Sequence, residues 1–261
     1  MRYLALSDSV TPCPYLPDRE FIAENFIAPS LRPDEMDTLL RSGYRHFGSY
    51  FFRPVCGGCS RCVPLRVIAG NHTNSRSERR LMNINRELVV TAGAPAPNKR
   101  AYQLYRMHQQ RFEVKSPATY ERFCRSFFAP TSGNTQISVY LNGLLISVLH
   151  LDVTGTSVSA VYCYYDTRFE KRSLGTFSVL KGLHFAGKLK VEHFYLGYIV
   201  SGNRHMEYKM RFRPNEFLSS AGWIFYKAAD GTTDHTEEYE RGFPGDEYRK
   251  RGAFPDILSH R

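Results

Sequence analysis

The strongest constraint on the fold is an Asn-Gly pair, Asn142-Gly143, between two apolar runs in the stretch "TQISVYLNGLLISVLHLDV". Asn and Gly readily adopt the positive φ angles of a two-residue type I′ turn, so this pattern predicts a β-hairpin. A third strand is expected at 156–166, a helix at 172–189 and a further strand at 190–200. This order indicates an α+β fold, because regular alternation of strands and helices is absent.

The region before the hairpin mixes helical and extended patterns. We expect helices at 33–43, 75–88, 98–112 and 119–129, and extended segments at 43–55 and 62–69. The stretch "TAGAPAPNK" at 91–99 places two prolines among small residues, which predicts a linker. We therefore expect an N-terminal basic, cysteine-containing domain at 1–94, a second domain at 95–230 and a C-terminal tail at 231–261.

The charge of the chain is concentrated in its first half. The whole sequence has 35 Lys and Arg against 25 Asp and Glu, but 14 basic residues face only three acidic ones between Arg41 and Lys115. A basic region of this kind favours a polyanionic partner such as nucleic acid, because binding releases condensed counterions. The alternative is a basic surface that serves only solubility.

The protein is expected to be cytoplasmic. A hydrophobic content of 42% excludes a mostly disordered chain. No apolar run approaches the roughly 20 residues that span a bilayer, and the first ten residues lack the apolar core and cleavage site of a signal peptide. In a reducing compartment, clustered cysteines favour a metal or redox site over disulfides.

Three of the six cysteines form a C-x2-C-x2-C run, Cys56, Cys59 and Cys62, around Gly57-Gly58. Glycines permit the tight turns that direct successive sulfur atoms toward one centre. Cys13, which is flanked by prolines, is the best remote fourth ligand. Four thiolates suit either tetrahedral zinc or an iron–sulfur cluster, and packed free thiols are the alternative.

A second candidate site lies where the third strand leads into the helix. Arg172, Ser173, Leu174 and Gly175 form an R-x-x-G pattern, and Lys171 adds another positive charge. The first turn of a helix has unpaired N–H groups and a partial positive charge, so it can bind phosphate. The pattern resembles the phosphate-binding turn of the Gcn5-related acyltransferase (GNAT) fold.

Basic residues also alternate near the end of the recognisable sequence. Lys209, Arg211 and Arg213 are two positions apart, so they share one face if this segment is extended. Such a row of cations could receive a carboxylate or a phosphate backbone. The alternative is a solvated strand face.

Several blocks of the sequence together resemble the aminoacyl-tRNA–protein transferase family, and most closely its bacterial aspartate/glutamate leucyltransferase branch. They are, in order, "CPYLPDRE", "GYRHFGSYFFRPVCGGCSRCVPLRV", "RSERRLMNINREL", "SAVYCYYD", "RSLGTFSVL", "FYLGYIV" and "MEYKMRFRPNE". The resemblance implies a cysteine-bearing N-terminal domain and a GNAT-like C-terminal domain. It also implies transfer of leucine from leucyl-tRNA to proteins that begin with Asp or Glu, which marks them for N-end rule degradation. Arginyl-tRNA is the alternative donor.

The resemblance suggests roles for individual residues. In this hypothesis Asp166 is the general base or an anchor for the acceptor amine, and Arg172 with the amides near Gly175 holds the tRNA terminus or the oxyanion. The remaining assignments are cations for the acceptor's acidic side chain (Lys209, Arg211), rings that stack on the terminal adenine (Tyr198, Tyr208), tRNA contacts (Arg79, Arg80, Arg86, Lys171) and metal ligands (Cys13, Cys56, Cys59, Cys62). The chemistry itself requires no cofactor.

Two other classes of function compete with this hypothesis. A non-catalytic RNA-binding protein stapled by a metal would use the basic half alone and would bind tRNA without transfer. An acetyltransferase that uses coenzyme A would share the R-x-x-G turn but would not need the large basic region.

Overall fold

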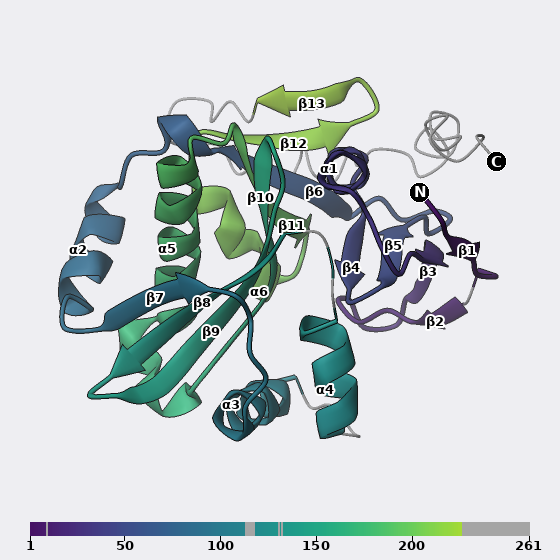
Figure 1. Cartoon of the computed structure of the whole chain (residues 1–261). Coiled ribbons are helices and arrows are strands. Elements are labelled where there is room, and N and C mark those ends of the chain that lie inside the picture. The colour runs from purple at the N-terminus through teal and green to yellow at the C-terminus, as the bar shows by residue number, and fades with distance from the viewer. Residues whose placement is uncertain (9, 113–117, 130, 132, 226–261) are drawn as a thin grey trace.

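The computed structural model describes residues 1–225 except 9, 113–117, 130 and 132. The predicted tail at 231–261 lies outside the described residues. Within them the chain forms two β-sheets with helices packed against them (Figure 1). The helices are α1 (Pro33–Arg41), α2 (Arg76–Ile84), α3 (Lys99–Gln110), α4 (Tyr120–Phe127), α5 (Leu174–Leu189) and α6 (Arg204–Glu207), with short 3-10 turns η1 (Ala69–Asn71), η2 (Thr167–Arg172) and η3 (Tyr208–Arg211).

The larger sheet has eight strands in the order β13-β12-β6-β11-β10-β9-β8-β7. Their bounds are β6 Cys62–Ile68, β7 Val89–Gly93, β8 Asn134–Leu141, β9 Leu144–Val153, β10 Ser157–Tyr165, β11 His193–Val200, β12 Asn215–Ser219 and β13 Gly222–Phe225. The smaller sheet contains β1 Leu4–Ala5, β2 Val10–Pro12, β3 Glu20–Ile27, β4 Arg45–Phe47 and β5 Tyr50–Pro54.

The predicted hairpin and the strand that follows it are confirmed. β8 and β9 pair with Leu141 opposite Leu144, and the turn residues Asn142 and Gly143 have φ of 49° and 79°. Positive φ at both positions is the requirement of the type I′ turn. β10 then pairs antiparallel with β9.

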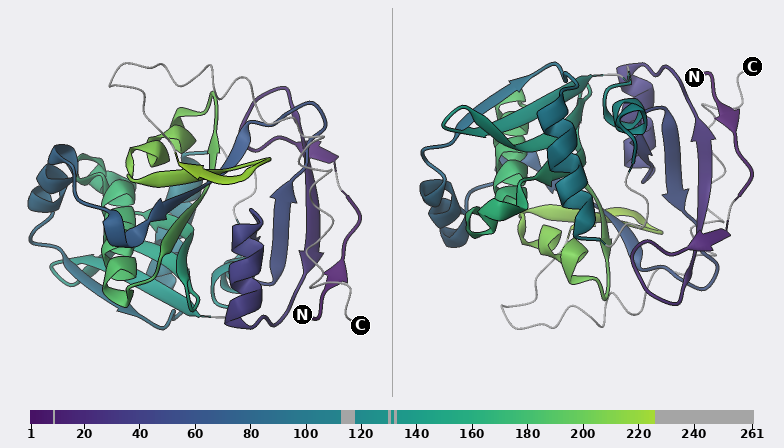
Figure 2. Two further views of the ribbon diagram at one scale, coloured as in Figure 1. Left: turned by 90° about the horizontal axis from the view of Figure 1, so that it is seen from above. Right: turned by 90° about the horizontal axis from the view of Figure 1, so that it is seen from below.

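The helix α5 crosses from β10 to β11, which runs parallel to β10. It packs on one face of the larger sheet, where Val179, Leu180 and Leu183 join a buried apolar cluster with residues of β6, β9 and β11. Three antiparallel strands, a crossing helix and a parallel strand give the predicted α+β fold with a GNAT-like arrangement. Figure 2 shows α5 enclosed between this sheet and α2.

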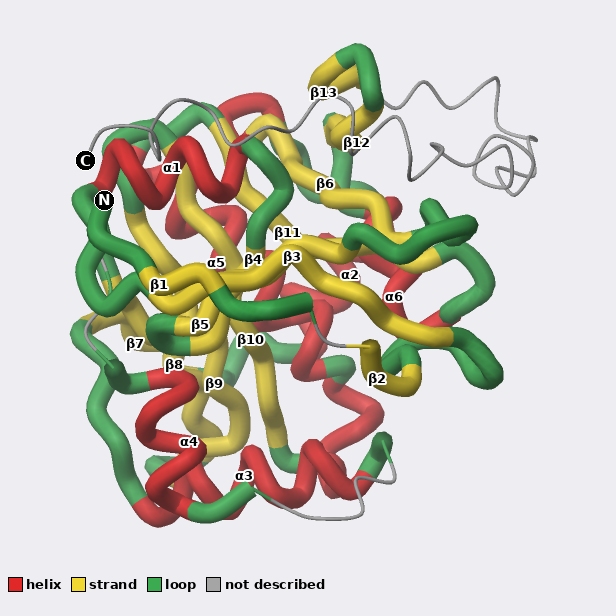
Figure 3. The backbone as a smooth tube through the Cα atoms, turned by 90° about the vertical axis from the view of Figure 1, so that its right-hand side faces the viewer, coloured by secondary structure: helices red, strands yellow, loops and turns green. Residues whose placement is uncertain are grey.

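The opposite face of the larger sheet carries α3, α4 and the smaller sheet. Leu104 of α3 and Phe127 of α4 pack against Val148 of β9 and Tyr164 of β10 in a second cluster. Seen from this side, β1, β3 and β5 lie in front of β10 and α5 (Figure 3).

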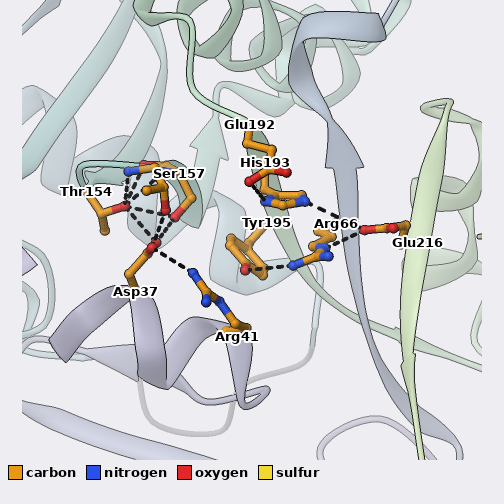
Figure 4. Close-up of polar contacts among 10 residues, drawn as sticks. Asp37, Arg41, Arg66, Thr154, Ser157, Glu192, His193, Tyr195 and Glu216 are labelled. Carbon is orange, nitrogen blue, oxygen red and sulfur yellow. Dashed lines mark hydrogen bonds and ion pairs between the residues drawn. The ribbon is translucent and has the colours of Figure 1, made fainter. Parts of the chain in front are cut away.

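A polar network fastens α1 to the larger sheet. Asp37 accepts hydrogen bonds from the hydroxyls of Thr154 (2.8 Å) and Ser157 (2.5 Å), which lie at the turn between β9 and β10 (Figure 4). Beside it, Arg66 forms a 2.6 Å ion pair with Glu216, which joins β6 to β12. Buried polar groups that are paired in this way fix the orientation of the elements that carry them.

The strands cross the boundary expected near residue 94. β6 and β7 precede that position, yet β6 pairs with β11 and β12, and β7 pairs with β8. The larger sheet therefore contains strands from both segments. The division into domains at 1–94 and 95–230 stays a prediction. Among the described residues, no helix combines the length and apolarity that crossing a membrane requires.

Candidate active site

β10 and β11 separate soon after they begin. They pair only from Ser157 opposite His193 to Ser159 opposite Tyr195. Beyond this point β10 continues with β9 alone, and β11 continues with β6. Beyond this point the backbone N–H and C=O groups of β10 and β11 do not pair with each other.

Arg45, the first residue of β4, reaches into this separation from the smaller sheet. Its guanidinium donates to the Ser159 hydroxyl (2.7 Å) and to the Ala160 carbonyl. Gly197 on β11 has φ of +80°, and a Cβ there would lie 3.3 Å from Arg45 Nε. Glycine thus meets two needs at once, because it tolerates this φ and leaves room for the guanidinium.

Lys209 approaches the same place from η3. Its Nζ donates to the Tyr198 carbonyl (2.7 Å) and lies 3.7 Å from Met206 Sδ. Desolvation, with a smaller contribution from the positive charge of Arg45, lowers the pKa of Lys209 to about 7. The cations Arg45 and Lys209 therefore come together from positions far apart in sequence.

The expectation that Lys209, Arg211 and Arg213 share one face of an extended segment is wrong. Residues 208–211 form a 3-10 turn, in which neighbours two apart point in different directions. Arg211 is exposed, and its Nε donates to the Tyr208 carbonyl (3.0 Å). In the sequence these cations alternate with Tyr208, Met210 and Phe212, which is the pattern of a half-buried strand. The pattern therefore did not distinguish a strand from a 3-10 turn.

The two tyrosines expected to stack on adenine differ in their surroundings. Tyr198 is 3% exposed, and its hydroxyl donates to the Gly43 carbonyl (2.7 Å), so its ring presents no open face in this conformation. Tyr208 is half-buried, and burial raises its pKa. Tyr208 is therefore the better placed of the two for a stacking role.

Asp166 follows the last residue of β10 and caps η2, the turn that leads into α5. Its fully buried carboxylate accepts hydrogen bonds from Arg168 Nη2 and Arg100 Nη2, both at 2.7 Å. The hydrogen bonds from Arg168 and then Arg100 lower the pKa of Asp166 to about 2. A carboxylate this stable in its ionised form is a poor general base, and its geometry is that of an anchor between α3 and η2.

Gly175 lies in the first turn of α5, against the ring of Tyr165. A Cβ at Gly175 would lie 3.0 Å from Tyr165 Cε1. Arg111 at the end of α3 lies over the same ring, with 5.3 Å between the guanidinium carbon and the ring centroid. The first turn of α5, an aromatic ring and a cation thus meet at Gly175, and phosphate binding by this turn stays a prediction.

Arg172 and Lys171 belong to η2 and lie beside α2. Arg172 forms an ion pair with Glu87, and its carbonyl accepts a hydrogen bond from Asn85 Nδ2 (2.9 Å). Lys171 is exposed. Arg172 therefore joins the end of α2 to the start of α5.

The basic helix predicted at 75–88 is present as α2, although it ends at Ile84. Ser75 caps it, with the Ser75 hydroxyl accepting from Glu78 N and the Glu78 carboxylate accepting from Ser75 N. Arg79, Arg80 and the following Arg86 are all exposed. They are free to contact a polyanion.

The four cysteines expected to bind a metal line one open pocket, together with Leu16 and Tyr198. They are free thiols, and burial raises the pKa of Cys56 and Cys62. Cys56 Sγ accepts a hydrogen bond from Ile22 N (3.3 Å) and so turns toward β3.

Cysteine sulfur suits zinc or an iron–sulfur cluster, but the side chains as placed do not form such a site. Over residues 1–225, outside the gaps named above, no three His, Cys, Asp or Glu side chains are arranged to hold a metal ion.

Comparison with known proteins defines the family. The models for the N terminus and the C terminus of arginine-tRNA–protein transferases match residues 11–80 and 100–219. An aspartate/glutamate leucyltransferase of Campylobacter jejuni is 30% identical over 219 residues, which cover 82% of this chain and 92% of that protein. The chain belongs to the arginine-tRNA–protein transferase family. It is therefore an aminoacyl-tRNA–protein transferase.

Two further comparisons place this transferase among its relatives. An aspartate/glutamate leucyltransferase of Gluconobacter oxydans is 32% identical over 228 residues, covering 83% of this chain and 92% of that protein. Among solved structures, FemX has 9% identity and a TM-score of 0.42, covering 86% of this chain and 68% of that chain. The latter similarity is distant.

Sequence reasoning about this transferase missed Arg45, Arg100 and Arg111. Arg45 stands in the block "GYRHFGSYFFRPV", which carries the family resemblance, but its partners Ser159 and Ala160 lie 114 and 115 positions away. No local pattern indicates such a contact.

Proposed function

We propose that this transferase moves leucine from leucyl-tRNA to the α-amino group of proteins that begin with Asp or Glu, marking them for N-end rule degradation. One observation carries the choice of donor and acceptor. The curated relatives from C. jejuni and G. oxydans are both named aspartate/glutamate leucyltransferase and are matched over 92% of their length.

In this proposal the tRNA lies along α2 and η2. Arg79, Arg80, Arg86 and Lys171 offer exposed positive charges to the phosphate backbone. The 3′ end reaches the first turn of α5 near Gly175, where unpaired N–H groups and the helix dipole favour an anion. Arg172 adds a positive charge between the end of α2 and the start of α5.

The chemistry needs little beyond the positioning of two reactants. The nitrogen of the acceptor's neutral α-amine bonds to the ester carbon, and the bond from that carbon to the tRNA 3′ oxygen breaks. One amine proton passes through solvent to the departing oxygen, which leaves as the 3′ hydroxyl of the tRNA. The ester is already activated, and positioning contributes up to roughly 7–11 kcal/mol in favourable cases. An α-amine with a pKa near 7.7–8.0 is partly neutral at physiological pH. Asp166 then acts as a positioning residue.

The metal assignment for Cys13, Cys56, Cys59 and Cys62 stays a prediction. Metal analysis and an absorption spectrum of protein purified without oxygen would distinguish zinc, an iron–sulfur cluster and free thiols. A signal from neither metal would reject this assignment.

The function is tested by incubating the purified protein with radiolabelled leucyl-tRNA and a peptide that begins with Asp. We expect the peptide to gain one leucine, while a matched peptide that begins with Asn gains little. Arginyl-tRNA and acetyl-coenzyme A run in parallel as donors. Transfer from arginyl-tRNA alone would reject the leucyl donor, acetylation would favour the acetyltransferase, and tRNA binding without any transfer would leave the non-catalytic alternative.

A further inference from the structure

Arg45 and Lys209 form a pair of cations that lacks a carboxylate. Both side chains are half-buried, and their described hydrogen-bond partners are a hydroxyl, two backbone carbonyls and a thioether. Among the residues that the structure describes, neither forms an ion pair. Burial, and then the charge of Arg45, lower the pKa of Lys209 to about 7, so its ammonium is only partly protonated at neutral pH. A bound carboxylate would stabilise the charged form of both side chains.

Asp152, a carboxylate whose charge could neutralise them, already has a partner. The charge of Asp152 acts on Arg45, but Asp152 is fully buried and lies 2.7 Å from His46 Nε2. His46 also contacts the Gly48 carbonyl through Nδ1 (2.8 Å). Asp152 therefore joins β9 to β4 through His46. It does not form an ion pair with Arg45 or Lys209.

The cation pair also keeps unused donors. Described residues accept hydrogen bonds from two of the five N–H groups of the Arg45 guanidinium. They accept hydrogen bonds from at most two of the three N–H groups of the Lys209 ammonium. The contacts with Ser159 and Ala160 hold the guanidinium in place, so the remaining N–H groups are oriented before a ligand arrives. A planar carboxylate matches such a guanidinium edge.

The position of the pair separates it from the proposed path of the tRNA. α2 and α5 lie on one side of the larger sheet, and Arg45 enters from the smaller sheet on the other side (Figure 2). Lys209 follows Tyr208 in η3, and Tyr208 is near enough to Tyr165, beside the first turn of α5, for the charge of Tyr165 to act on its pKa. An acceptor held by the pair would meet a donor held at α5.

We propose that Arg45 and Lys209 form the subsite for the side-chain carboxylate of the acceptor's N-terminal Asp or Glu. This inference rests on the proposed function and assigns the acceptor specificity to two residues from different sheets of the molecule. A phosphate of the tRNA is the other anion that the pair could take, and the test distinguishes the two.

The test compares acceptor peptides that differ only in their first residue, Asp or Asn. For the wild-type protein, the ratio of kcat/KM for Asp to that for Asn measures recognition of the carboxylate. Lys209→Met keeps the length of the side chain and removes its charge, and we expect it to lower this ratio by about tenfold or more. Arg45→Lys, which keeps the charge but loses the planar edge, should lower it less than Arg45→Met does.

Two controls make the result specific. Arg204→Met removes an exposed cation from the neighbouring α6 and should leave the ratio unchanged. Binding of leucyl-tRNA, measured by filter retention, should be the same for wild type and Lys209→Met.

Each outcome decides whether Arg45 and Lys209 bind the acceptor carboxylate. A weakened tRNA affinity with an unchanged Asp/Asn ratio would assign the pair to a phosphate and overturn the inference. An unchanged ratio and unchanged tRNA affinity in folded variants would also overturn it, because the pair would then be only structural. A wild-type protein that transfers nothing to any peptide would instead refute the proposed function.

Discussion

Replacing Asp166 with Asn would separate a positioning role from a catalytic one. The amide keeps the shape of the side chain, and its oxygen can still accept the hydrogen bond from Arg168 N, which caps the turn at 3.1 Å. What the substitution removes is the negative charge between Arg168 and Arg100, each 2.7 Å from the carboxylate. The change therefore tests the charge alone.

The size of the effect follows from the pKa of Asp166, which falls from its ordinary 3.8 to about 2 on folding. A difference of this size contributes about 2 kcal/mol to the free energy of unfolding at neutral pH. Because the folded-state pKa is the lower one, this contribution is complete well above pH 4 and is lost as the pH falls toward 2. At pH 3 roughly half of it remains.

Urea unfolding at pH 7 and pH 3, followed by circular dichroism, measures this directly. We expect Asp166→Asn to be about 2 kcal/mol less stable than wild type at pH 7 and about 1 kcal/mol less stable at pH 3. Its kcat for leucine transfer, measured where it is folded, should stay within about tenfold of wild type. A loss of a hundredfold or more in kcat with wild-type stability would show that the carboxylate takes part in proton transfer, and equal destabilisation at both pH values would refute the role of its charge.

Three further predictions concern the surfaces around this turn. Arg79→Glu with Arg80→Glu should weaken tRNA binding and reduce the slope of log affinity against log salt concentration by about two, and unchanged affinity would mean a solvated surface. Arg172→Ala should lower the transfer rate by about tenfold or more with less than about 1 kcal/mol lost in stability, whereas Glu87→Gln, which breaks the same ion pair but keeps the cation, should retain most of the rate. Gly197→Ala should lower the free energy of unfolding by about 1–2 kcal/mol, because alanine is strained at φ of +80°, and an unaltered urea midpoint would contradict this.

Elements with local signals could be predicted from the sequence. The Asn142-Gly143 turn carries its own backbone preference, so the hairpin follows from two residues. Capping residues mark the starts of α2 and α3 in the same way, since Ser75 and Asn98 accept hydrogen bonds from Glu78 N and Ala101 N. Such interactions lie within a few positions of each other.

The site depended on interactions that no local pattern contains. Lys209 was recognised as a candidate, but its environment is set by Arg45 and by the Tyr198 carbonyl, which belong to β4 and β11. Asp166 was recognised as well, yet its two arginines decide its chemistry, and Arg100 lies 66 positions earlier. Residue types could therefore be predicted, whereas protonation and pairing required the packed structure.

The place of β6 in the larger sheet has a consequence for how the chain is made. Its hydrogen-bonding neighbours are β11 and β12, and Ile68 pairs with His193, 125 positions later. At a synthesis rate of about 5–20 residues per second, β6 leaves the ribosome about 6–25 s before its partner exists. For that interval a strand whose interior is buried in the finished protein exposes unpaired backbone and apolar side chains, which invites association with other chains. Until β11 is made, β6 therefore remains an unpaired apolar strand, and we expect association with other chains to be favoured during synthesis.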